Sequence, residues 1–463
     1  MIGMIGMNKK QIEEKLKQRV KGGDIDNWKM METSVKHKNH YITIDGKPES
    51  SLSSERHEFK ITIYKKYQDG LGEGSFIQSE SSSKEDFEKE LDDAVFMTTQ
   101  GKSKPYTVPE KTDACVNDKH IDYSIFTDNK YIQQFDTEDI DTVMSSLYEK
   151  LSAAVKNAST QNINIFVNYF ECLNTVTKET LSTSGGIEKS RTGQNSYIEY
   201  CLTAQDTAHN KESEYIVYEK INDLLSEEAE CSFEKNAGYA ADSLKSKKAE
   251  NFTGPVILSG PALHEFMCPL LRNNPLVAHA SARFSFYGLS RFKLGETVLE
   301  TKGDPLTLYS NPLMPGNAAS RPFDADGVAA KRLCLIENNV CRNYLASKQY
   351  ADYLGVEATG PKGVTEIELG TRTTQQLRSM EPAVEIVSFA SFVPDSMSGH
   401  FSAEIRLGYY IKEGKRIPFK GGLFTGNVFD LAEHMYLSSS NRIKTGYSGP
   451  EAIRFEDSSI VGM

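Results

Sequence analysis

The order of hydrophobic and polar positions predicts alternating helices and strands in the first part of the chain. Ile12, Leu16 and Val20 recur at helical spacing among Lys and Glu, which predicts an amphipathic helix near the beginning. Stretches near 39–45 and 57–65 have the composition of strands, and a glycine turn follows the first of them. We therefore expect a helix followed by two strands.

Two more apolar stripes predict helices further along. Ser83 is placed to cap a helix that presents Phe87, Leu91 and Val95 on one face. A longer stripe of Val, Met, Leu and Ala predicts a second helix over residues 142–157.

The next segment alternates with the period of a strand. Apolar and asparagine residues alternate over 163–169, a glycine turn lies at 184–186, and alternation returns over 197–203. This order predicts an antiparallel meander. The charged stretch 213–248 is predicted to be helical.

The amino-acid composition of the sequence changes near Gly254. Residues 255–258 predict a short buried strand, and glycine, proline and aromatic residues then dominate, with helices expected only at 261–271 and 339–353. We predict an α+β protein of two domains. Residues 1–250 would hold helices on an antiparallel sheet, and residues 251–463 a mostly β domain.

Composition and charge narrow the function classes. Of the 463 residues 38% are apolar and 25% charged, enough for two cores of about 200 residues each. The net charge of −11 opposes phosphate binding, so no direct nucleic-acid contact is expected. Seven cysteines without a CxxC pair indicate reduced thiols and a cytoplasmic location. No run of about 18 apolar residues occurs, so no membrane span is expected.

One segment carries residues with metal chemistry. Ser259 and a proline at 261 predict the start of a helix on which His264 and Cys268 share one strip, with Glu265 beside them. An imidazole, a thiolate and an adjacent glutamate could serve as two zinc ligands and a general base. Pro269 follows directly and disturbs the helix.

Two interpretations of this strip remain open. The first is a helix flank with a solvated His–Glu pair and a buried cysteine, which we favour because such spacings recur by chance. The second is a metal site, for which His279 and His400 are the single candidates for a third ligand. Two other segments, 324–327 and 421–427, resemble the start of a calcium loop and a phosphate loop, but both are better explained as turns.

Several segments, read in order, resemble the TldD/PmbA family, whose members are also known as modulators of DNA gyrase. No single segment is specific, but their order and spacing are, and the resemblance is weak before residue 160 and strong after 250. The segments that carry it are Leu181–Gly186, Pro322–Val328, Arg332–Glu337, Ser398–Glu404, Gly426–Asn427 and Ser458–Gly462.

The resemblance implies one of two roles. The TldD branch resembles a zinc peptidase with an HExxxH helix and a late cysteine ligand, whereas the PmbA branch, also called TldE, lacks these ligands and pairs with TldD. Here Pro269 stands where the second histidine is expected, and residues 437–463 contain no cysteine. Only His264 and Glu265 carry over, which places the chain with the PmbA-like branch.

We therefore predict a PmbA/TldE-like, non-catalytic subunit of a metalloprotease that degrades or processes unfolded peptides. A TldD-like zinc peptidase would be its partner and would hold the zinc, so no cofactor is expected in this chain. The alternatives are an autonomous metallopeptidase that binds zinc through His264 and Cys268 with Glu265 as base, or a homodimeric peptide-binding protein.

Overall fold

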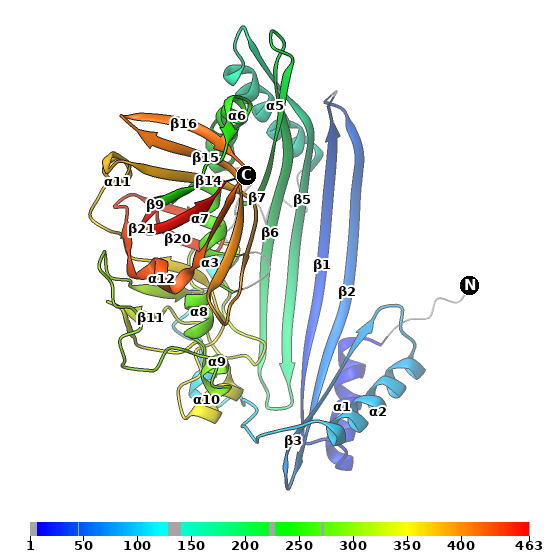
Figure 1. The fold of residues 1–463 in the computed structure, drawn as a ribbon. Coiled ribbons are helices and arrows are strands. Elements are labelled where there is room, and N and C mark those ends of the chain that lie inside the picture. Colours follow the sequence, from blue (N-terminus) through cyan, green and yellow to red (C-terminus); the bar gives the residue numbers. More distant parts are fainter. Residues whose placement is uncertain (1–6, 45, 128–139, 222–226, 270–272, 463) are drawn as a thin grey trace.

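The computed structural model describes residues 7–44, 46–127, 140–221, 227–269 and 273–462. Long strands stand side by side in the first half of the chain, and the second half packs against one edge of them (Figure 1). The prediction of an α+β fold with an antiparallel sheet and a mostly β second half is confirmed.

A seven-stranded antiparallel sheet forms most of the first half. Its order, β4-β3-β2-β1-β5-β6-β7, joins two meanders through the pairing of β1 with β5. Buried and part-exposed residues alternate along β5, because successive side chains of a strand point to opposite faces. The strands are β1 Asn27–Thr43, β2 Pro48–Tyr67, β3 Gly70–Ser79, β4 Lys102–Ser103, β5 Ile163–Thr183, β6 Glu188–Asp206 and β7 Lys211–Ile221.

Two pairs of helices cover opposite ends of this sheet (Figure 1). The first pair, α1 (Lys9–Gly22) and α2 (Lys84–Gln100), buries its apolar stripes against β1 and β2. The second pair, α5 (Ile140–Ala158) and α6 (Glu227–Lys245), packs against β5, β6 and β7. A short helix, α3 (Ser124–Thr127), and a 3-10 turn at Ala114–Val116 lie between the two pairs in sequence.

The three helices predicted from apolar stripes are confirmed. Ser83 caps α2 as expected, through a reciprocal pair of hydrogen bonds with Asp86. The glycine turn at 184–186 also joins β5 to β6, as the meander required.

The prediction of helix over residues 213–248 is wrong for its first part. Residues 211–221 form β7, α6 begins at Glu227, and residues 222–226 lie outside the described part of the chain. Tyr215 and Val217 point into the core while the residues between them are part-exposed or exposed. The β-branched and aromatic residues favour a strand, and the charges on its other face imitate the polar side of a helix.

Two sheets make up the second half. One has the order β12-β11-β10-β13-β20-β19, and the other the order β14-β9-β21-β17-β15-β16-β8. The second sheet closes into a ring because β14 also pairs with β15. The strands are β8 Lys247–Lys248, β9 Phe252–Ser259, β10 Leu308–Asn311, β11 Leu333–Glu337, β12 Val340–Cys341, β13 Val364–Ile367, β14 Ala383–Pro394, β15 His400–Lys412, β16 Lys415–Lys420, β17 Leu423–Asn427, β18 Met435–Leu437, β19 Asn441–Lys444, β20 Tyr447–Pro450 and β21 Ala452–Val461.

The helices of the second half are short. The helix predicted over 339–353 is confirmed only in its last part, because a hairpin between β11 and β12 turns through Asn338 and Asn339 with positive φ. The described helices are α7 Gly260–Met267, α8 Pro275–His279, α9 Ala282–Phe286, α10 Lys348–Leu354, α11 Thr374–Ser379 and α12 Val428–Glu433.

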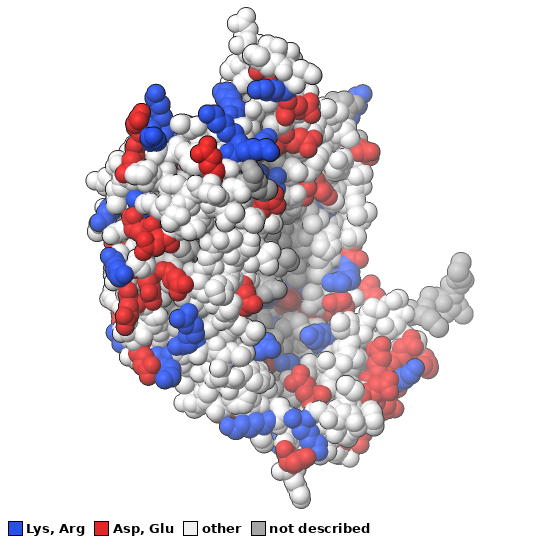
Figure 2. All heavy atoms as spheres, viewed as in Figure 1, with Lys and Arg blue, Asp and Glu red and all other residues white. Residues whose placement is uncertain are grey.

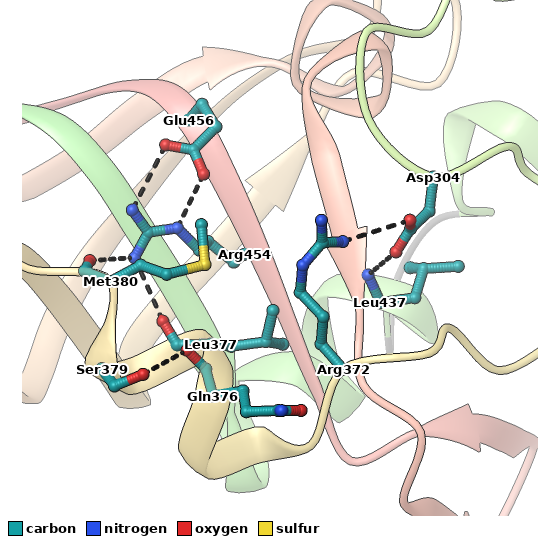
Figure 3. A network of polar contacts seen from close by, with 9 residues as sticks. All are labelled: Asp304, Arg372, Gln376, Leu377, Ser379, Met380, Leu437, Arg454 and Glu456. Atoms are coloured by element: carbon teal, nitrogen blue, oxygen red, sulfur yellow. Dashed lines mark hydrogen bonds and ion pairs between the residues drawn. The ribbon is translucent and has the colours of Figure 1, made fainter.

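A buried arginine fastens α11 to β21 (Figure 3). The Arg454 guanidinium donates to the backbone carbonyls of Leu377 and Met380 at 3.2 and 2.8 Å, and pairs with Glu456 at 2.7 Å. The carbonyls at the end of α11 lack helical partners, so Arg454 satisfies them as well as crossing between two elements. A neighbouring pair, Arg372 and Asp304, holds β18 through the Leu437 amide.

No helix in the described ranges is both long enough and apolar enough to cross a membrane. The large sheet and its four long helices lie before residue 250 in sequence, and both sheets of the second half are built almost wholly from residues after it. The division into domains 1–250 and 251–463 stays a prediction.

Candidate functional site

Helix α7 carries the candidate metal residues. It follows β9 directly, and Gly260 makes the turn between them with φ +58°, a conformation that side chains other than glycine rarely adopt. Leu263, Phe266 and Met267 are buried in the core of the second half. This packing fixes the orientation of α7, so the strip that carries His264 and Cys268 faces away from the core.

The helix is shorter than predicted. It ends at Met267, and Cys268 is its C-cap residue. Pro269 follows and cannot continue the helix. Residues 270–271 of the predicted helix lie outside the described part of the chain. Ser259 occupies the capping position, but its hydroxyl donates to Glu385 at 2.7 Å instead of capping the helix.

The structure brings His264 and Cys268 together on one strip, as predicted, and a turn of the chain lies against both. His264 Nε2 is 2.9 Å from the carbonyl oxygen of Thr445, and the Cys268 thiol is 2.9 Å from that of Gly446. Because a carbonyl only accepts, the imidazole Nε2 and the thiol act as donors. The turn between β19 and β20 therefore uses both groups as hydrogen-bond donors.

Burial holds both groups in their uncharged forms. It lowers the pKa of His264 to about 4, a shift that the bond to Thr445 only partly opposes. Burial also raises the pKa of the Cys268 thiol to about 11. A zinc ligand must be a neutral imidazole or a thiolate, so His264 is in the right state but Cys268 is protonated at neutral pH.

Glu265 lies next to this pair and behaves differently. Its half-buried carboxyl makes no hydrogen bond or ion pair with any residue that the structure describes. Burial raises the pKa of Glu265 to about 7, and the nearby Arg406 opposes part of this rise. A carboxyl that titrates near neutral pH suits a general base or acid.

The residues present do not fit a three-ligand zinc centre. No group of three or more His, Cys, Asp or Glu side chains in the described ranges is arranged to hold a metal ion. His279, one candidate third ligand, is fully buried and uses both ring nitrogens, toward the Met397 carbonyl and the Arg291 amide. His400, the other candidate, is exposed at the start of β15. The assignment of these residues as metal ligands stays a prediction.

A cleft opens beside this strip. It consists of two cavities of about 450 and 560 Å³, and Lys220, His264 and Cys268 line both of them. One wall is formed by residues 215–220 of β7, the last strand of the seven-stranded sheet. The opposite wall combines α7 with parts of β14, β15 and β19. The cleft therefore lies between the sheet edge and the second half of the chain.

The sequence showed α7 but not the cleft. The charge pattern over residues 213–221 predicts a helix, so the sequence does not reveal the free edge of β7. The alternation of Tyr215 and Val217 with more exposed residues is the signal that favours a strand. Arg406 and Arg442 reach the cleft from strands far along the chain. No local pattern distinguishes them from other charged residues on β strands.

Comparison with known proteins supports a family assignment. Residues 253–462 match the family model of the PmbA/TldA metallopeptidase C-terminal domain. An uncharacterised protein of Methanocaldococcus jannaschii is 27% identical over 194 residues, which cover 40% of this chain and 45% of that protein. The metalloprotease PmbA homolog of Buchnera aphidicola is 22% identical over 389 residues, 82% of this chain and 81% of that protein.

Solved structures show the same fold. A protein described as a modulator of a DNA gyrase from Thermotoga maritima superposes with a TM-score of 0.75 at 17% identity, covering 98% of this chain and 100% of that one. TldE from Thermococcus kodakarensis gives 0.73 at 16% identity, covering 96% and 100%. The matching domain, the relatives and the shared fold agree with the sequence motifs: residues 253–462 belong to the PmbA/TldA C-terminal domain family, and the whole chain has the fold of the solved modulator of DNA gyrase and TldE structures.

Proposed function

We propose that this chain is a PmbA/TldE-like, non-catalytic subunit that holds an extended peptide for a TldD-like zinc peptidase. The observation that carries the proposal is the state of His264 and Cys268. Both donate to backbone carbonyls of one turn, and no third ligand joins them in the described ranges. The fold is that of the metallopeptidase relatives, while His264 and Cys268 hold the turn between β19 and β20 through hydrogen bonds.

The free edge of β7 supports the peptide-holding role. β7 ends the sheet order, and its residues 215–220 run along the cleft without a further strand beside them among the described residues. An extended peptide can add to such an edge through main-chain hydrogen bonds, which require no particular side chain in the peptide. This mode suits unfolded peptides of varied sequence.

Relatives support a two-subunit arrangement. The comparisons include proteins named PmbA and TldD from Buchnera aphidicola, and a structure named TldE. This chain would correspond to the PmbA/TldE member, act in the cytoplasm, and leave zinc chemistry to its TldD-like partner. Any effect on gyrase would follow from degradation of a protein, because the net charge of −11 opposes binding to the phosphates of DNA.

The test combines the purified chain with a TldD-like protein from the same organism. We expect the two to coelute in size-exclusion chromatography, and an unfolded peptide to be cleaved only when both are present. Glu265→Gln in this chain should leave cleavage intact, while loss of zinc from the partner should abolish it. Absence of any association at low salt would contradict the proposal.

The raised pKa of Glu265 favours one alternative function, that of an autonomous peptidase with Glu265 as general base. The zinc content of the untagged chain after dialysis against a weak chelator separates the two. One zinc ion per chain would favour the autonomous peptidase if Glu265→Gln also abolished cleavage while the zinc stayed bound. This result would replace the proposed subunit role.

A further inference from the structure

We propose that the cleft selects peptides that carry carboxylates, and that Arg442 and Arg406 are the residues that recognise them. This inference rests on the proposed function, since it names the class of peptide that the β7 edge would hold. It is carried by the charges that line the cleft and by the hydrogen-bonding state of the two arginines.

The cleft is basic although the chain is acidic. The whole chain has 53 Lys and Arg against 64 Asp and Glu. On the face shown in Figure 2, acidic side chains gather over α2 at the lower right, in line with its sequence. In the two cavities the balance is reversed, with two carboxylates, Glu219 and Glu265, and five cationic side chains: Lys220, Lys362, Arg406, Arg442 and Lys444.

The two carboxylates do not pair directly with the two arginines of the cleft. Glu219 accepts hydrogen bonds from Ser232 and Asn236 of α6. Neither Glu219 nor Glu265 forms an ion pair with Arg406 or Arg442 within the part of the chain that the structure describes. The positive charge of these two arginines is therefore available to a ligand.

Arg442 is the most distinctive of the cations. Its Nε is buried and has no hydrogen-bond partner, and no carboxylate pairs with the guanidinium among the described residues. A buried donor without a partner costs free energy, so such groups are rare and call for a partner. The residue as a whole is partly exposed and borders the cleft, and a planar guanidinium is the cation best suited to bind a carboxylate.

Arg406 and Lys362 have weak protein partners. Arg406 Nε is 3.4 Å from the Phe389 carbonyl, a long bond, and makes no described ion pair. Lys362 Nζ donates to the Asn273 amide oxygen at 2.9 Å, and burial lowers its pKa, an effect that Cys268 opposes. Cations held by neutral partners in a partly desolvated cleft strengthen the binding of an anion more than cations in open solvent would.

The geometry of an added strand explains how several of these cations could act together. Alternate side chains of an extended peptide point to the same face. A peptide on the β7 edge would therefore turn every second side chain toward one wall of the cleft, where β15 and β19 place Arg406 and Arg442. Aspartate or glutamate at alternate positions, or the free carboxylate at a peptide end, supplies the same chemistry.

The experiment measures binding of fluorescent peptides to the chain alone and to its complex with the TldD-like partner. One peptide carries Asp at alternate positions and an amidated end, a second carries Asn in their place, and a third carries Asn and a free carboxylate. We expect the Asp peptide to bind at least tenfold more tightly than the amidated Asn peptide, with affinity falling as salt rises. The third peptide shows whether an end carboxylate is sufficient.

Substitutions of the two arginines test whether they recognise the carboxylates of the peptide. Arg442→Gln should weaken binding of the Asp peptide about tenfold and leave the Asn peptide unchanged, and Arg406→Gln gives a second test if the first variant folds poorly. Arg342→Gln, which changes an exposed arginine paired with Glu337, is the matched control and should have no effect. Equal binding of Asp and Asn peptides would overturn this inference and leave the proposed function standing. Binding of none of the peptides, alone or in the complex, would overturn both.

Discussion

Two arginines of the second half show how the same side chain serves opposite purposes. Arg454 on β21 is 3% exposed and fully engaged, since it bonds with two backbone carbonyls and with Glu456 (Figure 3). Arg442 on β19 borders the cleft, and its buried Nε has no partner. An arginine that holds elements together has its hydrogen bonds satisfied by the protein. An arginine that lacks protein partners can bind a ligand instead.

Two glutamates, Glu385 on β14 and Glu265 on α7, repeat the contrast. Burial alone would raise the pKa of Glu385, but bonds from Arg378 and the attraction of Arg416 hold that pKa below its usual range. Glu265 has no such partners, and burial raises its pKa to about 7. The fold thus compensates the buried carboxylate on β14 and leaves the one that lines the cleft without an ion-pair partner among the described residues.

The largest expected effect comes from the engaged arginine. Arg454→Leu removes the cation from Glu456 and leaves the end of α11 without its cap, so we expect a loss of about 3–5 kcal/mol in the free energy of unfolding. Urea unfolding followed by circular dichroism measures it. Arg342→Leu, at an exposed ion pair, is the control and should cost about 0.5 kcal/mol or less. A loss for Arg454→Leu no larger than that of the control would show that its bonds do not support the fold.

The uncompensated glutamate should make stability depend on pH. Its folded pKa is raised, so the protonated form is favoured on folding, and its stabilising contribution is present below the unfolded pKa and lost as pH rises through about 7. Glu265→Gln should therefore become more stable than the parent between pH 5 and pH 8, by about 1–2 kcal/mol because solvent in the cleft screens the charge.

Unfolding midpoints at pH 5, 6, 7 and 8 test this difference. Glu404→Gln, at an exposed position of β15, is the matched control and should follow the parent at every pH. A Glu265→Gln variant that also follows the parent would mean that the carboxyl is solvated in the cleft, and would weaken the contrast with Glu385.

The features that the sequence predicted are those determined by neighbouring residues. The stripe Ile12, Leu16 and Val20 gives α1, and Ser83 caps α2, because helical faces and caps involve residues a few positions apart. The same locality found α7 and the pairing of His264 with Cys268 on one strip.

The features that were missed depend on distant parts of the chain. The carbonyl that accepts from His264 lies 181 residues further along, at Thr445. The free edge of β7 is set by the order of strands in the sheet, and charges on the outer face of that strand imitated a helix. The missing partner of Arg442 is a property of its final surroundings, which no spacing in the sequence records.

A smaller effect is expected at the strip of α7. Cys268→Ala removes the bond to the Gly446 carbonyl and should cost about 1 kcal/mol, while Cys268→Ser retains a donor and should cost less. Thermal unfolding with and without added zinc measures both. If zinc raised the unfolding midpoint of the parent but not that of Cys268→Ser, the thiol would be a metal ligand. The strip of α7 would then be a metal site and not only a structural contact.

The smallest effect on stability belongs to the arginine of the cleft, although its effect on binding should be the largest. Arg442→Gln removes a guanidinium that makes no described ion pair and whose Nε lacks a partner, so its free energy of unfolding should stay within about 0.5 kcal/mol of the parent. Urea unfolding in the absence of peptide checks this value against the loss for Arg454→Leu. A loss of several kcal/mol would mean that Arg442 supports the turn at Thr445 and Gly446 rather than a ligand. A stable variant that has lost its preference for acidic peptides would separate the two roles of arginine in this fold.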